Sequence, residues 1–519
     1  MSCSSDSFFE RFFLFARGDR KSLLGRIHVD SCLVIKMPYF KGGNYMEAFN
    51  NVVTAINGVV WGPIMLFLLI GTHVLLTIRT KGIQRKTFTG VKLSVTPDAE
   101  AAGDIGGFAA LATALAATIG TGNIVGVATA VGTGGPGAVF WLWFTGLLGM
   151  ATKYGEAILA VKYRVQAAAG SYIGGPMYAL ERGLGQKWLG VMFALFTGIA
   201  CFGIGNMTQG NSIAESVNGT FGVPKFVTGI VLMVLTGLVI LGGVKSISKV
   251  CEKLIPLMAG LYILGCVIIL VVNGAYVGPA FATIIKGAFN PQAVGGGFVG
   301  ATIVMCIRAG VSRGLFTNES GLGSAPIVDA CAATRTPARQ ALISMSGVFW
   351  DTIVVCLMTG LVLVSCIIKD PVGMDGLVGA NLTSGAFGTI PTVGPIVLTI
   401  GLITFAWSTI LGWSYYGERA WVYLVGVKSI KPFRIAWTLV VFVGCVAALD
   451  VVWNVADTLN ACMAFPNCVA LLGLSGVIAS ETKKYVWDKD AEMGGLMKWM
   501  DDEAPVVDKK SHHFLKMES

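Results

Sequence analysis

Long apolar stretches recur along the chain and are separated by short polar segments. An α-helix needs about 20 mostly apolar residues to cross a bilayer, because the hydrocarbon core is about 30 Å thick. Eleven stretches meet this length, and we expect each of them to form one transmembrane helix. They cover residues 57–78, 104–131, 137–163, 188–214, 223–243, 254–273, 297–322, 340–367, 394–418, 433–449 and 451–478. The pattern therefore predicts an all-α polytopic membrane protein.

The basic residues of the connecting loops are distributed unevenly. The loops after spans 1, 3, 5, 7 and 9 contain eighteen lysines and arginines, whereas the loops after spans 2, 4, 6, 8 and 10 contain only Lys225, Lys286 and Lys369. Cytoplasmic loops of membrane proteins carry the excess of positive charge. We therefore expect the amino terminus outside and the carboxyl terminus in the cytoplasm.

The two ends of the chain differ from the part that contains the spans. Residues 1–45 mix aromatic and charged residues, and their apolar core is too short for a signal peptide or a span. We expect them to be disordered or to precede a natural start at Met46. Residues 46–480 then form the transmembrane domain. Residues 481–519 are polar and charged, so we expect a solvated cytoplasmic tail.

The composition excludes several classes of protein. Hydrophobic residues make up 54% and charged residues 13% of the chain, with a mean hydropathy of +0.71, whereas an average soluble domain has about 25% charged residues. The net charge of +9 lies mainly in short loops, so it does not indicate a nucleic-acid partner. The twelve cysteines form no CxxC pair, and only His73 of the four histidines lies in a span. A metal cluster, a disulfide framework and a membrane-embedded enzyme are therefore disfavoured.

Two of the spans are interrupted by glycines and polar residues. GTGN occupies residues 120–123 of the second span, and RGLFTNESGLGSAP occupies residues 313–326 of the seventh. If the first span is additional, the other ten form two sets of five, and each interrupted helix is the first of its set. Because five is odd, the second set begins on the opposite side of the membrane, as in an inverted repeat. Interrupted helices at corresponding positions point to the binding site of a transporter.

An interrupted helix exposes backbone groups that bind ions. The amides that open the second half-helix carry partial positive charge, and the carbonyls that end the first half-helix carry partial negative charge. We therefore expect the amides of Thr121 and Gly122 to hold a carboxylate and the carbonyls of Ala116 and Ile119 to hold a small cation. Taken alone, GTGN would also fit a helix-packing contact or a kink.

Three motifs resemble those of a known transporter family, the alanine/glycine:cation symporters. In chain order they are GTGNIVGVATAVGTGGPGAVFWLWFTGLLGMATKYGEAILAVKYR (120–164), SRGLFTNESGLGSAP (312–326) and STILGWSYYGER (408–419). The likeness covers about residues 57–480. It implies a leucine-transporter-like fold of five-plus-five inverted helices. It also implies transport of alanine, glycine or similar small amino acids together with sodium, with a bacterial inner membrane as the usual location.

The resemblance implies a substrate site at the first break. On the family's pattern, Thr121, Gly122 and Asn123 meet the substrate carboxylate. Alternatively, Thr118 and Asn123 complete a cation site.

The resemblance implies further substrate contacts from three other spans. The second break contributes Phe316, Thr317 and Ser320, and its free carbonyls receive the substrate ammonium. Gln209 of the fourth span reaches the substrate, although an amide in a membrane more often joins two helices. Trp413 and Phe316 bound the pocket and limit the substrate side chain to about the size of a methyl group, unless they serve only packing.

The sodium site implied by the resemblance lies between the first break and the ninth span. Ser408 and Thr409 are adjacent hydroxyls, and the carbonyl of Phe405 lies one turn earlier. With the carbonyls of Ala116 and Ile119 they make five oxygen ligands, which suit a hard cation. A serine–threonine pair in a membrane helix more often bonds its own backbone.

Glu319 in the second break is the most conspicuous buried acid. A carboxylate inside a membrane is costly unless it is paired, and Arg308 and Arg313 lie nearby in sequence. We expect a structural ion pair or a gate in preference to direct substrate contact. Other acids in or at the ends of spans are expected to make helix-end or gating contacts, namely Glu156, Asp351 and Glu418.

These features predict a sodium-coupled secondary active symporter that imports small neutral amino acids such as alanine and glycine by alternating access. No cofactor besides the coupling ion is expected. The closest alternative is a proton-coupled amino-acid transporter, since Glu319 is able to titrate. A membrane-embedded enzyme and a channel are remote alternatives.

Overall fold

The computed structural model describes residues 45–98, 101–167, 171–290, 302–447 and 450–488. The expected extension at residues 1–45 therefore lies outside the described residues except for its last position, and most of the expected tail at residues 481–519 does so too. The chain divides into two compact units, Met1–Asn51 and Val52–Ser519. The former is described only at the start of α2 (Tyr45–Val60), and everything below concerns the latter.

The described residues are almost entirely helical, and the prediction of an all-α polytopic membrane protein is confirmed. Within the described residues, each of the eleven expected spans overlaps a helix or consecutive helices. Among the described residues, seven helices are long and apolar enough to cross a membrane, or eight if the bent pair at the first break is one span. The other expected spans fall on shorter or more polar helices, such as α7 (Ala138–Lys162) and α14 (Ile303–Asn318).

The first span and the first set of five occupy the chain up to Val272. α2 and α3 (Pro63–Arg79) form the first span. The interrupted second span consists of α5 (Gly107–Thr118), a π-helical turn (Gly122–Gly126) and α6 (Val127–Gly134). The following helices are α7, α8 (Pro176–Tyr178), α9 (Lys187–Phe202), α10 (Thr208–Phe221), α11 (Lys225–Ile240) and α12 (Gly243–Val272).

The second set of five begins with the other interrupted helix, α14. The helices after it are α15 (Pro326–Asp329), α16 (Pro337–Val348), a π-helical stretch (Phe349–Cys356), α17 (Leu357–Lys369), α19 (Val393–Val425), α20 (Ile430–Val446) and α21 (Asp450–Gly473). α22 (Ser475–Thr482) and a π-helical turn (Lys483–Trp487) follow the last span. Both interrupted helices thus stand first in their set, as the sequence predicts.

Several short elements between the spans are absent from the sequence prediction, because their apolar runs are too short to cross a bilayer. Two strands, β1 (Val165–Gln166) and β2 (Tyr172–Ile173), form an antiparallel pair. The helices are α4 (Thr87–Ser94), α13 (Gly274–Phe289) and α18 (Gly379–Gly388). Shorter turns cover Ile83–Lys86, Ala179–Gly183, Gly203–Met207 and Val427–Ser429.

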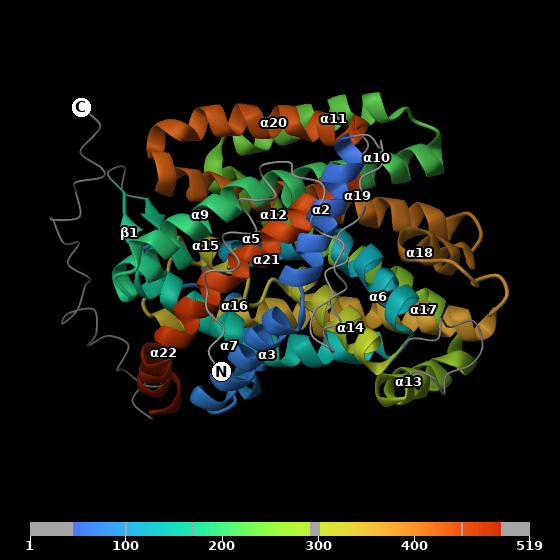
Figure 1. Ribbon diagram of the computed structural model, residues 1–519, viewed down its shortest axis with the longest axis horizontal. Helices are drawn as coiled ribbons and strands as arrows, with labels where there is room; N and C mark the ends of the chain where they lie inside the picture. Colours follow the sequence, from blue (N-terminus) through green and yellow to red (C-terminus); the bar gives the residue numbers. More distant parts are fainter. Residues whose placement is uncertain (1–44, 99–100, 168–170, 291–301, 448–449, 489–519) are drawn as a thin grey trace, which may run out of the picture. The chain divides into compact units, whose positions relative to one another are not determined.

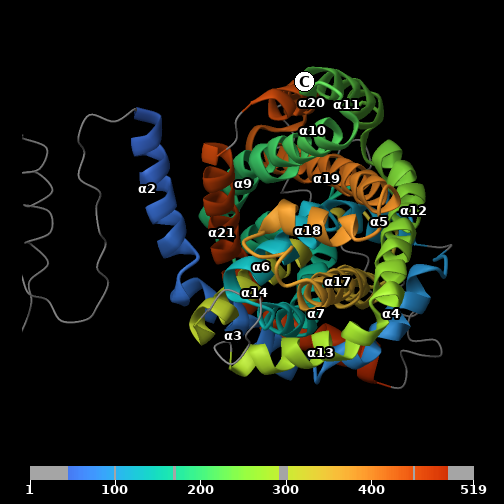
Figure 2. The ribbon, with the colours of Figure 1, turned by 90° about the vertical axis from the view of Figure 1, so that its right-hand side faces the viewer.

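α5 lies inside the bundle (Figure 2), and the second break at the end of α14 is buried, whereas the first turn of α14 is exposed. α5 packs against α12, α16 and α19, and α14 packs against α6 and α7. By contrast, α11 and α20 pack side by side at the edge of the bundle (Figures 1 and 2), and their outward residues such as Leu238 and Leu439 are exposed. Irregular backbone is tolerated at membrane depth only where protein or a cavity surrounds it. The core therefore shields both breaks from lipid.

Candidate functional site

The first interruption bends the second span by 52°. α5 ends at Thr118, Ile119 is extended with a ψ of 95°, and helical structure resumes at Gly122. The side chain of Asn123 closes the break, because its Oδ1 accepts a hydrogen bond of 3.0 Å from the amide of Gly120. The break thus creates a carbonyl end and an amide end only a few residues apart.

The second interruption unwinds the chain between α14 and α15. The backbone takes positive φ at Glu319 (56°), Gly321 (92°) and Gly323 (83°). Glycine adopts this conformation freely, whereas glutamate does so at a cost in free energy. Strain of this kind persists only where surrounding contacts hold it, and it is frequent at ligand-binding segments.

Side chains from two other helices hold the second break. Glu156 of α7 accepts hydrogen bonds through Oε1 from the amides of Gly321 (3.0 Å) and Gly323 (3.1 Å). Asn467 of α21 donates Nδ2 to the same Oε1 at 2.7 Å and to the carbonyl of Gly321 at 2.9 Å. Glu156 is therefore no helix-end contact. It lies inside the bundle and binds the unwound segment.

The two breaks lie side by side. A methyl group added at Gly122 of the first break would lie 2.9 Å from Cγ2 of Thr317 and 3.1 Å from Cδ1 of Phe316 in α14. Between them is a small buried cavity that residues from both breaks, α10, α19 and α21 enclose. Its lining comprises Ala117, Thr118, Gly120, Thr121, Gly122, Ile204, Gln209, Phe316, Glu319, Leu322, Thr409, Trp413 and Asn460.

Three polar atoms at this cavity have no hydrogen-bond partner among the described residues. They are Oγ1 of Thr121, Oε1 of Gln209 and Oδ1 of Asn460. All three residues are at least 97% buried, with Thr121 the most exposed at 3%. An unpaired polar atom that is buried costs about 1–3 kcal/mol. The cavity is therefore suited to a small ligand that supplies hydrogen-bond donors.

The cavity includes some of the expected substrate residues and leaves out others. The expected residues that line it are Thr121, Gly122, Gln209, Phe316 and Trp413.

Asn123, Thr317 and Ser320 are buried next to the cavity, but none of them lines it. Asn123 donates Nδ2 to Oδ1 of Asp351 at 2.6 Å, and Thr317 donates Oγ1 to the carbonyl of Gly314 at 2.9 Å. The hydroxyl of Ser320 faces α7 instead. The sequence does not reveal these directions, because residue type and spacing do not fix a side-chain orientation in an unwound segment.

The five expected sodium ligands converge between α5 and α19. The hydroxyl of Ser408 donates to the carbonyl of Ala116 at 3.2 Å and to that of Phe405 at 2.8 Å. The hydroxyl of Thr409 lies 3.4 Å from the carbonyl oxygen of Ile119 and 3.0 Å from that of Phe405. All five atoms are neutral oxygens, which are the ligands a hard monovalent cation prefers.

Comparison with known proteins places the chain among transporters. A profile of the sodium:alanine symporter family matches residues 46–497. The chain belongs to the sodium:alanine symporter family. The protein is accordingly a membrane transporter and not an enzyme, as the sequence predicts.

Individual relatives agree with this family. The chain is 52% identical over 444 residues to the sodium/alanine symporter AgcS of Methanococcus maripaludis, with 84% of this chain and 97% of the relative covered. It is 35% identical to the amino-acid carrier protein AlsT of Bacillus subtilis, with 85% and 93% covered. Among solved structures, MhsT in complex with L-phenylalanine has a TM-score of 0.49 at 17% identity, with 77% of this chain and 92% of that chain covered.

The expected ion pair of Glu319 with Arg308 or Arg313 is absent among the described residues. Glu319 accepts a hydrogen bond of 2.5 Å from the hydroxyl of Ser324 within the same unwound segment. Arg313 instead lies over the ring of Phe316, 5.9 Å from its centroid. The prediction of an ion pair is wrong because it relied on proximity in sequence. Arg308 and Arg313 lie on α14, whereas Glu319 follows the end of this helix, where the backbone changes direction.

Glu418, for which the sequence predicts a helix-end or gating contact, makes an ion pair. It lies two turns before the end of α19 and contacts the guanidinium groups of Arg419 and Arg434. Asp351 differs from this expectation, because it is buried within the π-helical stretch of the eighth span. Its carboxylate binds Asn123 of the first break.

Two buried polar groups near the breaks are not among the residues predicted from the sequence. Lys153 is 2% exposed in α7, and Asn460 is 1% exposed in α21. The signal for Lys153 was available, since KYGE places a lysine and a glutamate three residues apart on one helix face within an apolar run. For Asn460 there was none, because a single asparagine in a span more often joins two helices.

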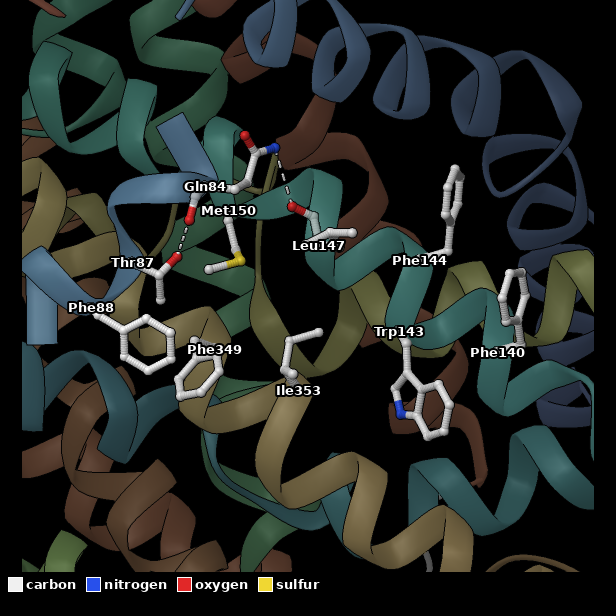
Figure 3. Close-up of a pocket in the computed structure, with 10 residues that line it drawn as sticks. All are labelled: Gln84, Thr87, Phe88, Phe140, Trp143, Phe144, Leu147, Met150, Phe349 and Ile353. Atoms are coloured by element: carbon white, nitrogen blue, oxygen red, sulfur yellow. Dashed lines mark hydrogen bonds between the residues drawn. The ribbon is translucent and has the colours of Figure 1, made fainter. Parts of the chain in front are cut away.

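A more open, larger groove is a different feature (Figure 3). It lies between α4, α7 and the π-helical stretch of the eighth span, and its lining is almost wholly apolar. The residues are Gln84, Thr87, Phe88, Phe140, Trp143, Phe144, Leu147, Met150, Phe349 and Ile353. Such a surface offers no counter-charges for the two ends of an amino acid. The cavity between the breaks is thus the better candidate for a zwitterion.

Proposed function

We propose that the protein imports alanine and similar small neutral amino acids, including glycine, together with sodium by alternating access. The observation that carries this proposal is the geometry of the first break. Its carbonyl end meets the hydroxyls of Ser408 and Thr409, and its amide end meets the cavity shared with the second break. One short segment thus contacts both proposed ligands.

We propose that the two charged groups of the substrate determine its orientation in the cavity. Its carboxylate binds the amides of Thr121 and Gly122, because the start of a helix carries partial positive charge and unpaired N–H groups. Its ammonium binds the unpaired oxygens of Gln209 and Asn460 and the carbonyls of the second break. Trp413 closes one side of the cavity and limits the length of the substrate side chain. A pocket of this kind discriminates one methylene by about 1–3 kcal/mol.

Sodium occupies the position between the carbonyls of Ala116, Ile119 and Phe405 and the hydroxyls of Ser408 and Thr409. When the ion binds, the two hydroxyl protons turn away from these carbonyls, and the hydroxyl oxygens become ligands. The set contains no carboxylate, so the positive charge is balanced by the dipoles of the carbonyl end. This arrangement suits a monovalent cation.

The driving force is sufficient for accumulation of substrate. One positive charge that moves across about 100 mV provides about 2.3 kcal/mol. A tenfold sodium gradient adds about 1.4 kcal/mol. The sum of about 3.7 kcal/mol allows one sodium ion to concentrate a neutral substrate about several hundred-fold. We also propose that the protein lies in a plasma membrane with its amino terminus outside and its carboxyl terminus in the cytoplasm, which the excess of basic residues in alternate loops supports.

Reconstitution into liposomes tests the function. We expect an imposed inward sodium gradient to drive uptake of labelled alanine, and a proton gradient of equal size without sodium to drive none. Proton coupling is the second candidate, because Glu319 lines the cavity. Glu319→Gln separates the two: sodium-driven uptake persists in this variant if sodium is the coupling ion. Equal uptake on a proton gradient without sodium would refute sodium coupling.

A further inference from the structure

α7 contains a lysine in the interior of the bundle. Lys153 is 2% exposed, and it lies in the middle of α7, between residues that face the second break. An ammonium at membrane depth costs several kcal/mol unless its surroundings compensate it. Buried ionisable groups in a transporter therefore mark a functional element more often than a packing contact.

The ammonium of Lys153 binds the carbonyl end of the second break. Its Nζ donates a hydrogen bond of 3.0 Å to the carbonyl oxygen of Asn318, which is the last residue of α14. The end of a helix carries about half a negative charge and has unpaired carbonyls. α5 and α14 both end at a break. Ser408 and Thr409 contact the carbonyl end of α5, and Lys153 contacts the carbonyl end of α14.

Four buried carboxylates lie within the electrostatic influence of Lys153. They come from α7, the second break, α15 and the π-helical stretch of the eighth span, and they are Glu156, Glu319, Asp329 and Asp351. Within the described ranges, Lys153 nevertheless makes no direct ion pair with any of them. The hydrogen bond to the carbonyl of Asn318 is thus the contact that positions the ammonium.

A second small cavity connects Lys153 with the first break. Lys153, Asp351, Thr118 and Asn318 are among its lining residues. Asp351 binds Asn123 of the first break through its carboxylate, and Thr118 also lines the cavity between the two breaks. The ammonium is thus close enough to both breaks to act on their conformation.

We infer that Lys153 is a built-in cation at the second break, so that one free sodium ion, and not two, accompanies each substrate molecule. The inference rests on the proposed function. Two interruptions create two carbonyl ends that need positive charge. The ammonium occupies one of them, and only the end at α5 remains for an ion from solution. Lys153 is a positioning residue in this scheme, because it holds the second break and touches no substrate.

The thermodynamic stoichiometry tests this inference on the unaltered protein. Proteoliposomes are held at zero membrane potential with a tenfold sodium gradient, and the opposing alanine gradient that stops net flux is measured. One sodium per alanine predicts zero flux at an alanine gradient of about tenfold, and two predict about a hundredfold. A hundredfold value would overturn the inference and leave the proposed function intact. Absence of any sodium-driven alanine flux would overturn the proposed function itself.

A pair of variants tests the role of the charge. Lys153→Gln removes the ammonium, so we expect alanine affinity to fall at least tenfold and the sodium dependence to become steeper, as a second ion enters the vacated position. Lys153→Arg keeps the charge and should retain a Hill coefficient near one. The control is Lys162→Gln on the same helix, which removes only a surface contact with Glu481. Lys153→Gln with unchanged affinity and unchanged sodium dependence would contradict the inference.

Discussion

The contact between the two breaks is tested most directly by adding one methyl group. In Gly122→Ala, the new Cβ would lie 2.9 Å from Cγ2 of Thr317 and 3.1 Å and 3.3 Å from two ring carbons of Phe316. These distances are shorter than ordinary carbon–carbon contacts of about 3.5–4.0 Å. Both neighbours belong to α14, so the first break must move away from the second.

The cost follows from the packing. Extra volume in a tightly packed interior destabilises by about 1–3 kcal/mol. Replacement of glycine by alanine in a helical turn recovers up to about 1 kcal/mol through its lower backbone entropy. The net cost of about 1–2 kcal/mol falls on the conformation that holds the breaks together. Alanine affinity should therefore fall about 5- to 30-fold.

Gly126 provides a matched control in the same segment. A methyl group added there meets only Cδ of Arg313, at 4.0 Å. The assay is equilibrium binding of labelled alanine to purified protein at saturating sodium, with thermal unfolding measured in parallel. We expect weakened binding for Gly122→Ala and wild-type binding for Gly126→Ala. Affinities within twofold of each other in the two variants would show that the breaks are not in contact.

Three further substitutions test other parts of the site. Ser408→Ala removes one proposed sodium ligand, so the sodium concentration for half-maximal uptake should rise about tenfold. The control Ser414→Ala loses only a hydrogen bond within its own helix and should leave this concentration unchanged. Glu156→Ala leaves the amides of Gly321 and Gly323 without their acceptor and should lower the free energy of unfolding, measured by denaturation in detergent, by at least about 2 kcal/mol. A loss below about 1 kcal/mol would contradict its role. Trp413→Leu enlarges the cavity and should improve uptake of larger neutral amino acids relative to alanine in competition assays; unchanged selectivity would remove Trp413 from the pocket wall.

The breaks were predictable because they need particular residue types. Glycines and hydroxyl residues inside apolar runs are unfavourable for an unbroken helix, so GTGN and the segment after Asn318 reveal the unwound positions. The meeting of Ser408 and Thr409 with the first break was predictable only from the family resemblance. Periodicity alone does not specify which faces of distant helices meet.

Side-chain directions within the breaks were not predictable. Asn123 belongs to the first break, yet it binds Asp351, which is 228 residues away in the chain. Glu319 has arginines nearby in sequence but binds Ser324. In both cases the partner depends on how an irregular backbone turns, and no repeating pattern encodes that turn. The partner of Lys153 was equally unpredictable. The carbonyl of Asn318 is free to accept its hydrogen bond only because α14 ends at that residue.

The first break is short enough for the proposed sodium and substrate positions to depend on each other. Only Gly120 and Thr121 separate the carbonyl of Ile119 from the amide of Gly122, so a shift at either end changes the geometry of the other. Thr118 extends this dependence, because it lines both the cavity between the breaks and the cavity next to Lys153. Linkage requires the effect to be mutual: the factor by which sodium raises alanine affinity equals the factor by which alanine raises sodium affinity. In the proposed site, a short segment with a ligand at each end therefore couples the two ligands without any long pathway.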